Sequence, residues 1–178
     1  NNGAPSGEKY FLFYNPPVIN RQLGIRKSLI KETARLVSRF LNHDIQTIVF
    51  ARSRLTTELL TSYLKDYFEK IGQGRDLVRG YRGGYLTNLR REIENGLKEN
   101  HYQCVVSTNA LGMGIDKPDI RFIVHTQMPA SLIHYYQEIG RVGRDGLPCR
   151  IVLIYNRHDK ELNWLFMKNS RLPTELSN

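Results

Sequence analysis

The sequence has few cysteines and no long apolar run. Its 178 residues include only Cys104 and Cys149, and two cysteines without a C-x-x-C pair provide no structural zinc site. Each cysteine opens an apolar stretch, so we expect both to be buried strand residues in a reducing cytoplasm. No stretch approaches the ~18 apolar residues that span a bilayer, and no signal peptide is visible. These absences favour a cytoplasmic domain that is held together by packing.

Acidic residues are outnumbered by basic ones. The chain has 26 Lys and Arg against 17 Asp and Glu, a formal net charge of +9. Such an excess favours a polyanionic partner, and nucleic acid is the commonest one. An anionic membrane is the competing interpretation. It is the weaker of the two, because no segment pairs a basic face with a strongly apolar one.

Short β-rich runs alternate with amphipathic stretches along the chain. Continuous apolar strands between helices favour a parallel sheet with helices on both faces, which is an α/β fold with one open, doubly wound domain. We expect residues 1–8 to be a loop-like edge, residues 9–168 to form the domain and residues 169–178 to be a polar tail. The predicted strands are 47–50, a weaker one at 77–78, 104–106, 122–124 and 151–155.

Apolar residues at helical spacing predict the helices between these strands. Ser53 and Ser131 stand where an N-cap is expected. The predicted helices are one from Ile30 to Leu41, one that follows Ser53 and ends near Ile71, one from Leu89 to about Asn100, one from Ser131 to Ile139, and one through Leu162 and Leu165.

Two arginines stand three residues apart beside glycines near the end of the chain. Residues 137–146 are Gln-Glu-Ile-Gly-Arg-Val-Gly-Arg-Asp-Gly, so the arginines are Arg141 and Arg144. A guanidinium is always charged, and its planar fork can hold phosphate oxygens in pairs. The pair therefore predicts a phosphate site. The alternative is that both are surface charges on a turn.

A second motif precedes the first and gives the chain a family resemblance. Residues 105–119 are Val-Val-Ser-Thr-Asn-Ala-Leu-Gly-Met-Gly-Ile-Asp-Lys-Pro-Asp. Together the two stretches resemble motifs V and VI of superfamily 2 helicases, most closely those of the RecQ DNA helicases. Tyr81-Arg-Gly-Gly-Tyr85, residues 90–94 and residues 15–17 resemble the YprA-type bacterial relatives. The resemblance spans about residues 9–160 and implies a RecA-like lobe, the second of two.

The nucleotide-binding signature of the first lobe is missing. The Walker A loop, G-x-x-x-x-G-K-[ST], requires a Gly-Lys pair, and none occurs in this sequence. No Asp-Glu pair follows an apolar run either. The resemblance therefore implies that ATP with Mg²⁺ is bound mainly by an N-terminal RecA-like lobe of the same protein. Alone, this chain is expected to hydrolyse no ATP at a useful rate.

The resemblance assigns five residues to the nucleotide. Arg144 resembles the arginine finger, and Arg141 its neighbour on the phosphates. Gln137 resembles the motif VI glutamine that links the nucleotide and strand sites, with a helix-surface amide as the alternative. Asp116 resembles the acid that hydrogen-bonds the ATP ribose, with a turn or cap residue as the alternative. Gly114 leaves room for a close approach of backbone.

A second group of residues is predicted to contact a nucleic-acid strand. Some of them match motif IV and follow the predicted strand 47–50, and others follow the predicted strand 77–78. Both sets would lie at the carboxyl edge of the sheet. Thr108 matches the motif V threonine, and an N-cap role is its rival. A solvated charged face is the alternative for Arg75, Arg90 and Arg91. The predicted strand contacts are Arg52, Ser53, Arg54, Arg82, Gly83 and Thr108.

Tyr135 and Tyr136 could stack on bases, but their helical spacing with Leu132 and Ile139 favours core packing. Three hypotheses for the whole chain stay open. It is the second lobe of a DNA helicase, the equivalent lobe of an RNA helicase, or a non-catalytic nucleic-acid-binding module. The RecQ-like motifs favour DNA, and the two arginines with Asp116 argue against a module that only binds.

Overall fold

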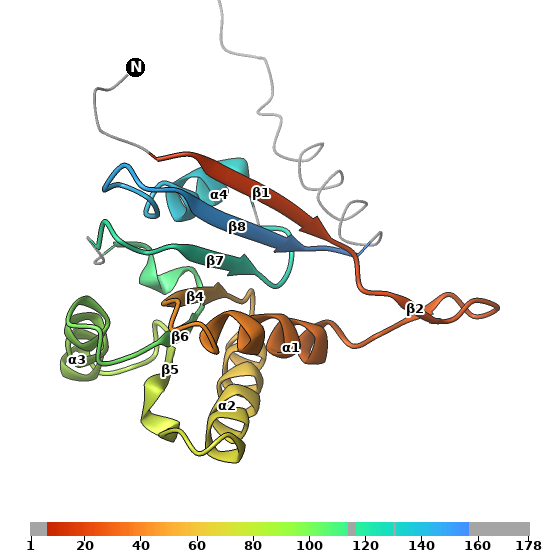
Figure 1. Cartoon of the computed structure of the whole chain (residues 1–178), viewed down its shortest axis with the longest axis horizontal. Helices are drawn as coiled ribbons and strands as arrows, with labels where there is room; N and C mark the ends of the chain where they lie inside the picture. The colour runs from red at the N-terminus through yellow and green to blue at the C-terminus, as the bar shows by residue number, and fades with distance from the viewer. Residues whose placement is uncertain (1–6, 114–116, 130, 157–178) are drawn as a thin grey trace, which may run out of the picture.

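A six-stranded, wholly parallel sheet forms the centre of the domain (Figure 1). The computed structural model describes residues 7–113, 117–129 and 131–156. The strand order is β1-β8-β7-β4-β6-β5. The strands are β1 Lys9–Tyr14, β4 Thr47–Phe50, β5 Val78–Tyr81, β6 Cys104–Ser107, β7 Phe122–His125 and β8 Cys149–Ile154.

Strand β4 lies in the middle and shows why the sequence forms a parallel sheet. Its Ile48 is opposite Val105 of β6 and Ile123 of β7. Every residue of β4, β6 and β7 is buried. Strands covered on both faces need continuous apolar runs, which these segments have. The predicted RecA-like α/β architecture is therefore confirmed.

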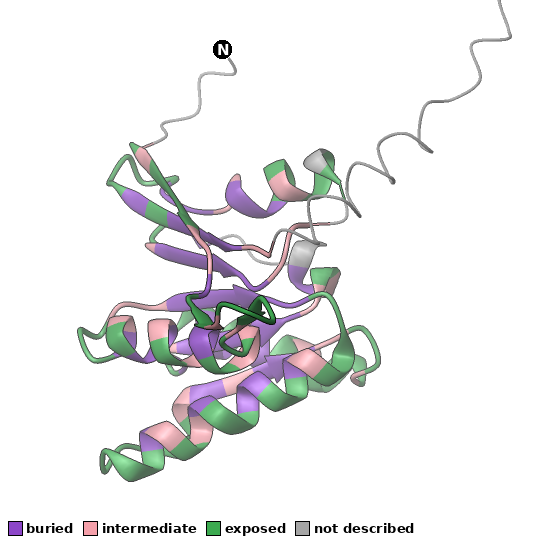
Figure 2. Cartoon of the chain, turned by 90° about the vertical axis from the view of Figure 1, so that its right-hand side faces the viewer, coloured by how far each residue is buried: buried purple, intermediate pink, exposed green. Residues whose placement is uncertain are grey.

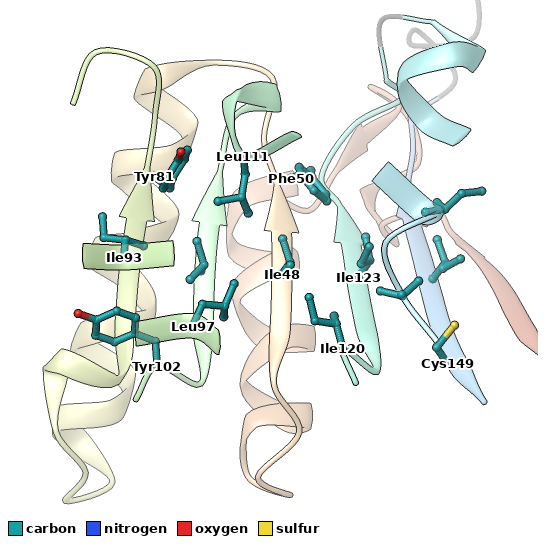
Figure 3. Close-up of a cluster of buried hydrophobic side chains, with 14 residues drawn as sticks. Ile48, Phe50, Tyr81, Ile93, Leu97, Tyr102, Leu111, Ile120, Ile123 and Cys149 are labelled. Carbon is teal, nitrogen blue, oxygen red and sulfur yellow. The ribbon is translucent and has the colours of Figure 1, made fainter. Parts of the chain in front are cut away.

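Helices cover both faces of this sheet, and side chains of β4 alternate between them. Val49 packs with α1 and α2 on one face, and Ile48 packs with α3 and α4 on the other. Figure 3 shows the second cluster, with Phe50 and Leu111 near the carboxyl ends of the strands and Ile120 near the amino ends. The helices are α1 Leu29–Leu41, α2 Arg54–Lys70, α3 Thr87–Lys98 and α4 Leu132–Ile139.

Figure 2 shows the buried strands between helices whose outer faces are exposed. Both serines expected to cap helices do so. The Ser53 hydroxyl accepts a hydrogen bond from the Thr56 amide at 3.0 Å, and that of Ser131 accepts one from the His134 amide at 3.2 Å.

The N-terminal part of the fold was not predicted. Strand β1 is an edge strand that pairs with β8, and a small hairpin, β2 Val18–Asn20 with β3 Ile25–Arg26, projects beside α1 (Figure 1). The aromatic run of β1 lacks the period-2 alternation that marks a half-buried strand. The strand expected at 77–78 starts at Val78 and runs to Tyr81, and Leu77 belongs to a 3-10 turn, Arg75–Leu77. The expected helix through Leu162 and Leu165 lies outside the described residues, as does the expected tail.

Candidate nucleotide and nucleic-acid interface

The predicted strand contacts follow strands that end at the same edge of the sheet. Strands β4, β5 and β6 are parallel neighbours, so the loops after Phe50, Tyr81 and Ser107 meet at their carboxyl ends. The Thr108 amide donates to the Tyr81 carbonyl at 3.2 Å. That hydrogen bond joins the loop after β6 to the loop after β5.

Two arginines, one at the start of α2 and one in the loop after β5, come close together at this edge. A Cβ built on Gly84 would lie 2.9 Å from Nη1 of Arg82 and 3.9 Å from Cζ of Arg54. Arg82 also donates through Nε to Glu58 Oε1 at 2.9 Å, and its guanidinium lies 4.8 Å from the centre of the Tyr85 ring. The Glu58 hydrogen bond raises the pKa of Arg82. One of the two cations is therefore partly neutralised by a carboxylate on α2.

The other predicted strand contacts divide between exposed and locally bonded groups. Arg52 and Gly83 are exposed. The Ser53 hydroxyl caps α2, and the Thr108 hydroxyl accepts from the Ala110 amide at 3.4 Å at the start of the 3-10 turn Asn109–Met113. The cap role considered for Thr108 is thus present. A hydroxyl retains further hydrogen-bonding capacity, so capping and phosphate contact are compatible.

The three further arginines considered above, Arg75, Arg90 and Arg91, differ in their contacts and exposure. Arg75 lies far from the loops at the carboxyl edge, at the end of α2, and is paired with Asp66 at 2.8 Å and Glu69 at 2.5 Å. That pairing agrees with the alternative of a charged surface. Arg90 is half-buried and Arg91 is exposed.

The predicted phosphate-binding arginines lie in a loop fixed by backbone hydrogen bonds. We call residues 140–146 the arginine loop. The Gly143 amide donates to the Ile120 carbonyl at 3.2 Å, and the Arg144 amide donates to the Pro118 carbonyl at 3.1 Å. Gly143 has φ +64°, and a Cβ there would lie 3.0 Å from Cys149 Sγ. Only glycine adopts this conformation without strain, so the loop needs it here.

An ion pair also anchors the arginine loop. Arg121, next to the start of β7, binds both carboxylate oxygens of Asp145, with 2.8 Å from Nη1 to Oδ1. The Arg121 hydrogen bond lowers the pKa of Asp145 to about 2. Asp145, the acidic residue of the arginine loop, is therefore paired with Arg121.

The two candidate arginines differ in burial. Arg144 is exposed and its Nε donates to the Gly140 carbonyl at 2.9 Å; Arg141 is half-buried. Burial and then the positive charge of Arg144 lower the pKa of Arg141, opposed by Glu138. An incoming phosphate would offset both effects. Both side chains are expected to be exposed in a lone lobe, and this is right for Arg144 and wrong for Arg141.

The remaining predicted nucleotide residues have mixed outcomes. Gln137 is exposed on α4, and Gly114 and Asp116 lie outside the described residues. Core packing is right for Tyr135, which packs against the buried cluster, and wrong for Tyr136, which is 68% exposed. Tyr136 faces away from the sheet, because Glu138 and Ile139 form the buried face of α4.

Sequence reasoning missed a contact between two buried polar side chains close to the arginine loop. His125, the last residue of β7, lies 2.6 Å from Glu138 of α4, measured from Nε2 to Oε2. The signal available was an acidic residue inside the arginine motif, next to apolar Ile139. Both cysteines, by contrast, are buried as expected, and burial raises the pKa of each thiol.

Two further features concern only the part of the chain that is described. In residues 7–113, 117–129 and 131–156, no helix combines the length and apolarity needed to cross a bilayer. Nor do three or more His, Cys, Asp or Glu side chains converge there as a metal-binding group.

Known proteins resemble this chain in sequence and in fold. The family described as Helicase conserved C-terminal domain matches residues 29–146. The chain is 46% identical over 155 residues to the uncharacterized ATP-dependent helicase YprA of Bacillus subtilis (strain 168), covering 87% of this chain and 21% of YprA. It is 33% identical over 145 residues to the ATP-dependent helicase HRQ1 of Saccharomyces cerevisiae, covering 80% of this chain and 13% of HRQ1.

Solved structures agree with these relatives. The DUF1998 helicase MrfA bound to DNA superposes with a TM-score of 0.83 at 42% identity, covering 94% of this chain and 23% of MrfA. The Lhr helicase of Mycobacterium smegmatis, at 24% identity and a TM-score of 0.71, shares the fold over 93% of this chain and 22% of Lhr. The expected resemblance to RecQ-family and YprA-type helicases is confirmed. The chain belongs to the helicase conserved C-terminal domain family, as the C-terminal RecA-like lobe of a superfamily 2 helicase.

Proposed function

We propose that this chain is the second motor lobe of an ATP-dependent DNA helicase. It spans 21% of YprA and 13% of HRQ1, so the activity of a whole helicase requires parts that lie beyond this lobe. In the proposal, it closes on an N-terminal RecA-like lobe of the same protein with ATP between them. That the structure of MrfA was solved with both DNA and AMPPNP supports DNA and ATP as the ligands.

The arginine loop is the observation that supports this proposal most strongly. Its backbone is held by Ile120 and Pro118, its acidic residue is engaged by Arg121, and Arg144 stays exposed. Charge stabilisation of a reacting phosphate needs donors that are already in place before the reaction. Arg144 is proposed as the arginine finger, with Arg141 and Gln137 beside it.

The nucleotide would be held mainly by the other lobe. Cleavage of ATP supplies the free energy for strand movement, and Mg²⁺ is assigned to the first lobe together with the Walker A loop. In this chain, Asp116 is proposed to accept hydrogen bonds from the ribose hydroxyls, and Gly114 to allow close approach of backbone.

The strand is proposed to bind at the carboxyl edge. Arg54 and Arg82 converge near Gly84 and would neutralise phosphates without regard to base sequence. The exposed Arg52 and Gly83 and the hydroxyls of Ser53 and Thr108 complete the proposed contacts. The hydrogen bond from the Thr108 amide to the Tyr81 carbonyl keeps the loop after β6 and the loop after β5 at a fixed spacing.

Replacement of the proposed finger tests this function in the longer protein that includes the first lobe. We expect Arg144→Ala to lower strand-stimulated ATP turnover by about 10³–10⁵-fold, the range known for arginine fingers. Affinity for a 20-nucleotide single strand should change by less than about twofold. The matched control is Arg150→Ala, which removes an exposed arginine from β8. Unchanged turnover in Arg144→Ala, or an equal loss of turnover and strand binding, would contradict the assignment.

The longer protein that includes the first lobe also distinguishes the rival hypotheses. Unwinding of matched DNA and RNA duplexes identifies the substrate, and the proposal expects DNA to be unwound faster. A protein that binds strands but hydrolyses no ATP would instead be the non-catalytic module. The proposed domain limits, residues 9–168, and the proposed cytoplasmic location stay predictions.

A further inference from the structure

A buried ionisable pair joins the end of a central strand to the helix before the arginine loop. His125 is 1% exposed and Glu138 is 7% exposed, and 2.6 Å separates His125 Nε2 from Glu138 Oε2. Removing such groups from water is costly, and an apolar pair of similar volume would often serve packing as well. The contact therefore calls for an explanation beyond packing.

The imidazole packs against two aromatic rings. The ring of Phe50, at the end of β4, is stacked with that of His125 at 5.3 Å between centroids. The ring of Tyr135 on α4 meets it edge-on at 5.0 Å. With two aromatic rings packed against it and Nε2 bonded to Glu138, the imidazole has little freedom to rotate. Any displacement of the loops around His125 is then passed to the Glu138 carboxylate.

One side of the pair opens towards the proposed strand contacts. A cavity of about 200 Å³ lies at the carboxyl edge and is lined by His125 and Glu138 together with Arg52, Asn109 and Gln127. Arg52 is a proposed strand contact, and Asn109 follows Thr108, which is another. In addition, Nδ1 of His125 is buried without a hydrogen-bond partner among the described residues.

The other side of the pair acts on the arginine loop. Glu138 is three residues before Arg141, and its carbonyl accepts from the Arg141 amide at 3.3 Å. Its charge raises the pKa of Arg141 and so opposes the effects of burial and of Arg144. Glu138 thus contacts His125, which lines the cavity near the proposed strand contacts. It also acts electrostatically on Arg141, which is proposed to bind the nucleotide.

We propose that His125 and Glu138 are positioning residues that connect strand binding at the carboxyl edge to the arginine loop. A strand held near Arg52 and Asn109 would fix the wall of the cavity that contains His125. The imidazole would then hold Glu138, and with it the orientation and the electrostatic surroundings of Arg141. The inference rests on the proposed function, and it assigns the pair to the stimulation of ATP turnover by nucleic acid.

Removal of the carboxylate charge tests the inference in the longer protein that includes the first lobe. Glu138→Gln keeps the side-chain shape and an oxygen that accepts from the imidazole. We expect the strand-stimulated kcat to fall roughly tenfold, which corresponds to about 1.4 kcal/mol in the barrier. The KM for ATP and the affinity for 20-nucleotide oligo(dT) should each stay within about twofold. The matched control is Glu94→Gln on α3, because the Glu94 carboxylate also bonds a ring group, the Tyr81 hydroxyl.

A second variant tests whether the two residues act as one unit. His125→Gln should cause a similar loss, and the double variant should be no worse than either single one. Losses that multiply in the double variant would overturn the inference. So would a Glu138→Gln effect no larger than that of Glu94→Gln, or a parallel loss of kcat, strand affinity and melting temperature, which a purely structural contact would give.

The outcome for Arg144→Ala separates this inference from the proposed function. If turnover requires Arg144 but is insensitive to Glu138→Gln, only the role of the pair is rejected. If turnover persists in Arg144→Ala, both the arginine finger and the pair that serves its loop are rejected.

Discussion

In the proposed function Glu58 competes with nucleic acid for Arg82, so its removal should strengthen strand binding. The carboxylate accepts from Arg82 Nε at 2.9 Å, and both side chains are partly exposed. An exposed pair of this kind is weak and is screened by solvent. Freeing Arg82 should therefore increase affinity by no more than about fivefold. One additional phosphate contact should also steepen the salt dependence of binding to a single strand by about 0.7 in log–log slope.

Fluorescence anisotropy with labelled oligo(dT) at about 50 and 200 mM salt measures both quantities, because one additional contact changes the affinity ratio across this range by about 2.5-fold. The control is Glu69→Gln, which removes the same charge from the same helix beside Arg75, at the other end of α2, where Arg75 stays paired with Asp66. Equal effects of Glu58→Gln and Glu69→Gln would refute the reasoning, because they would show that only net charge matters.

Two further predictions concern the arginine loop. The Arg121 contact lowers the pKa of Asp145 to about 2, so its contribution to stability is complete above the unfolded value of about 3.9 and is lost as the pH falls through about 2. An NMR titration should place the carboxyl midpoint near 2 and move it towards about 3.9 in Arg121→Ala; an unmoved midpoint would contradict this. Gly143→Ala should lower the free energy of unfolding by at least about 1–2 kcal/mol in urea denaturation, since φ is positive there and the new methyl group would meet Cys149, and an unchanged midpoint would disprove the need for glycine.

The sheet was predictable because its centre has a simple pattern. β4, β6 and β7 are short, apolar and β-branched, and parallel strands buried on both faces require this composition. Strand β1 gave no comparable signal. It is an edge strand whose exposed Tyr10, Phe11, Leu12 and Phe13 follow no alternation, and only its pairing with β8 identifies it.

The candidate site was predictable in its residue types and less so in its contacts. Arg141 and Arg144 could be identified by their spacing to glycine, because a chain that binds phosphate needs close backbone approach and fixed charge. The partners of charged residues could not be foreseen. Arg82 with Glu58, Arg121 with Asp145 and His125 with Glu138 lie 24, 24 and 13 residues apart in sequence. Such pairings follow from the crossing of helices and strands, which no local pattern encodes.

The most direct test of the central claim is a structure of the longer protein, with its first lobe, bound to a non-hydrolysable ATP analogue and a single strand. If the arginine loop donates hydrogen bonds to the nucleotide, the Arg144 guanidinium should lie within about 3 Å of a γ-phosphate oxygen. A closed complex in which Arg144 faces solvent, or in which another residue occupies that position, would contradict the claim.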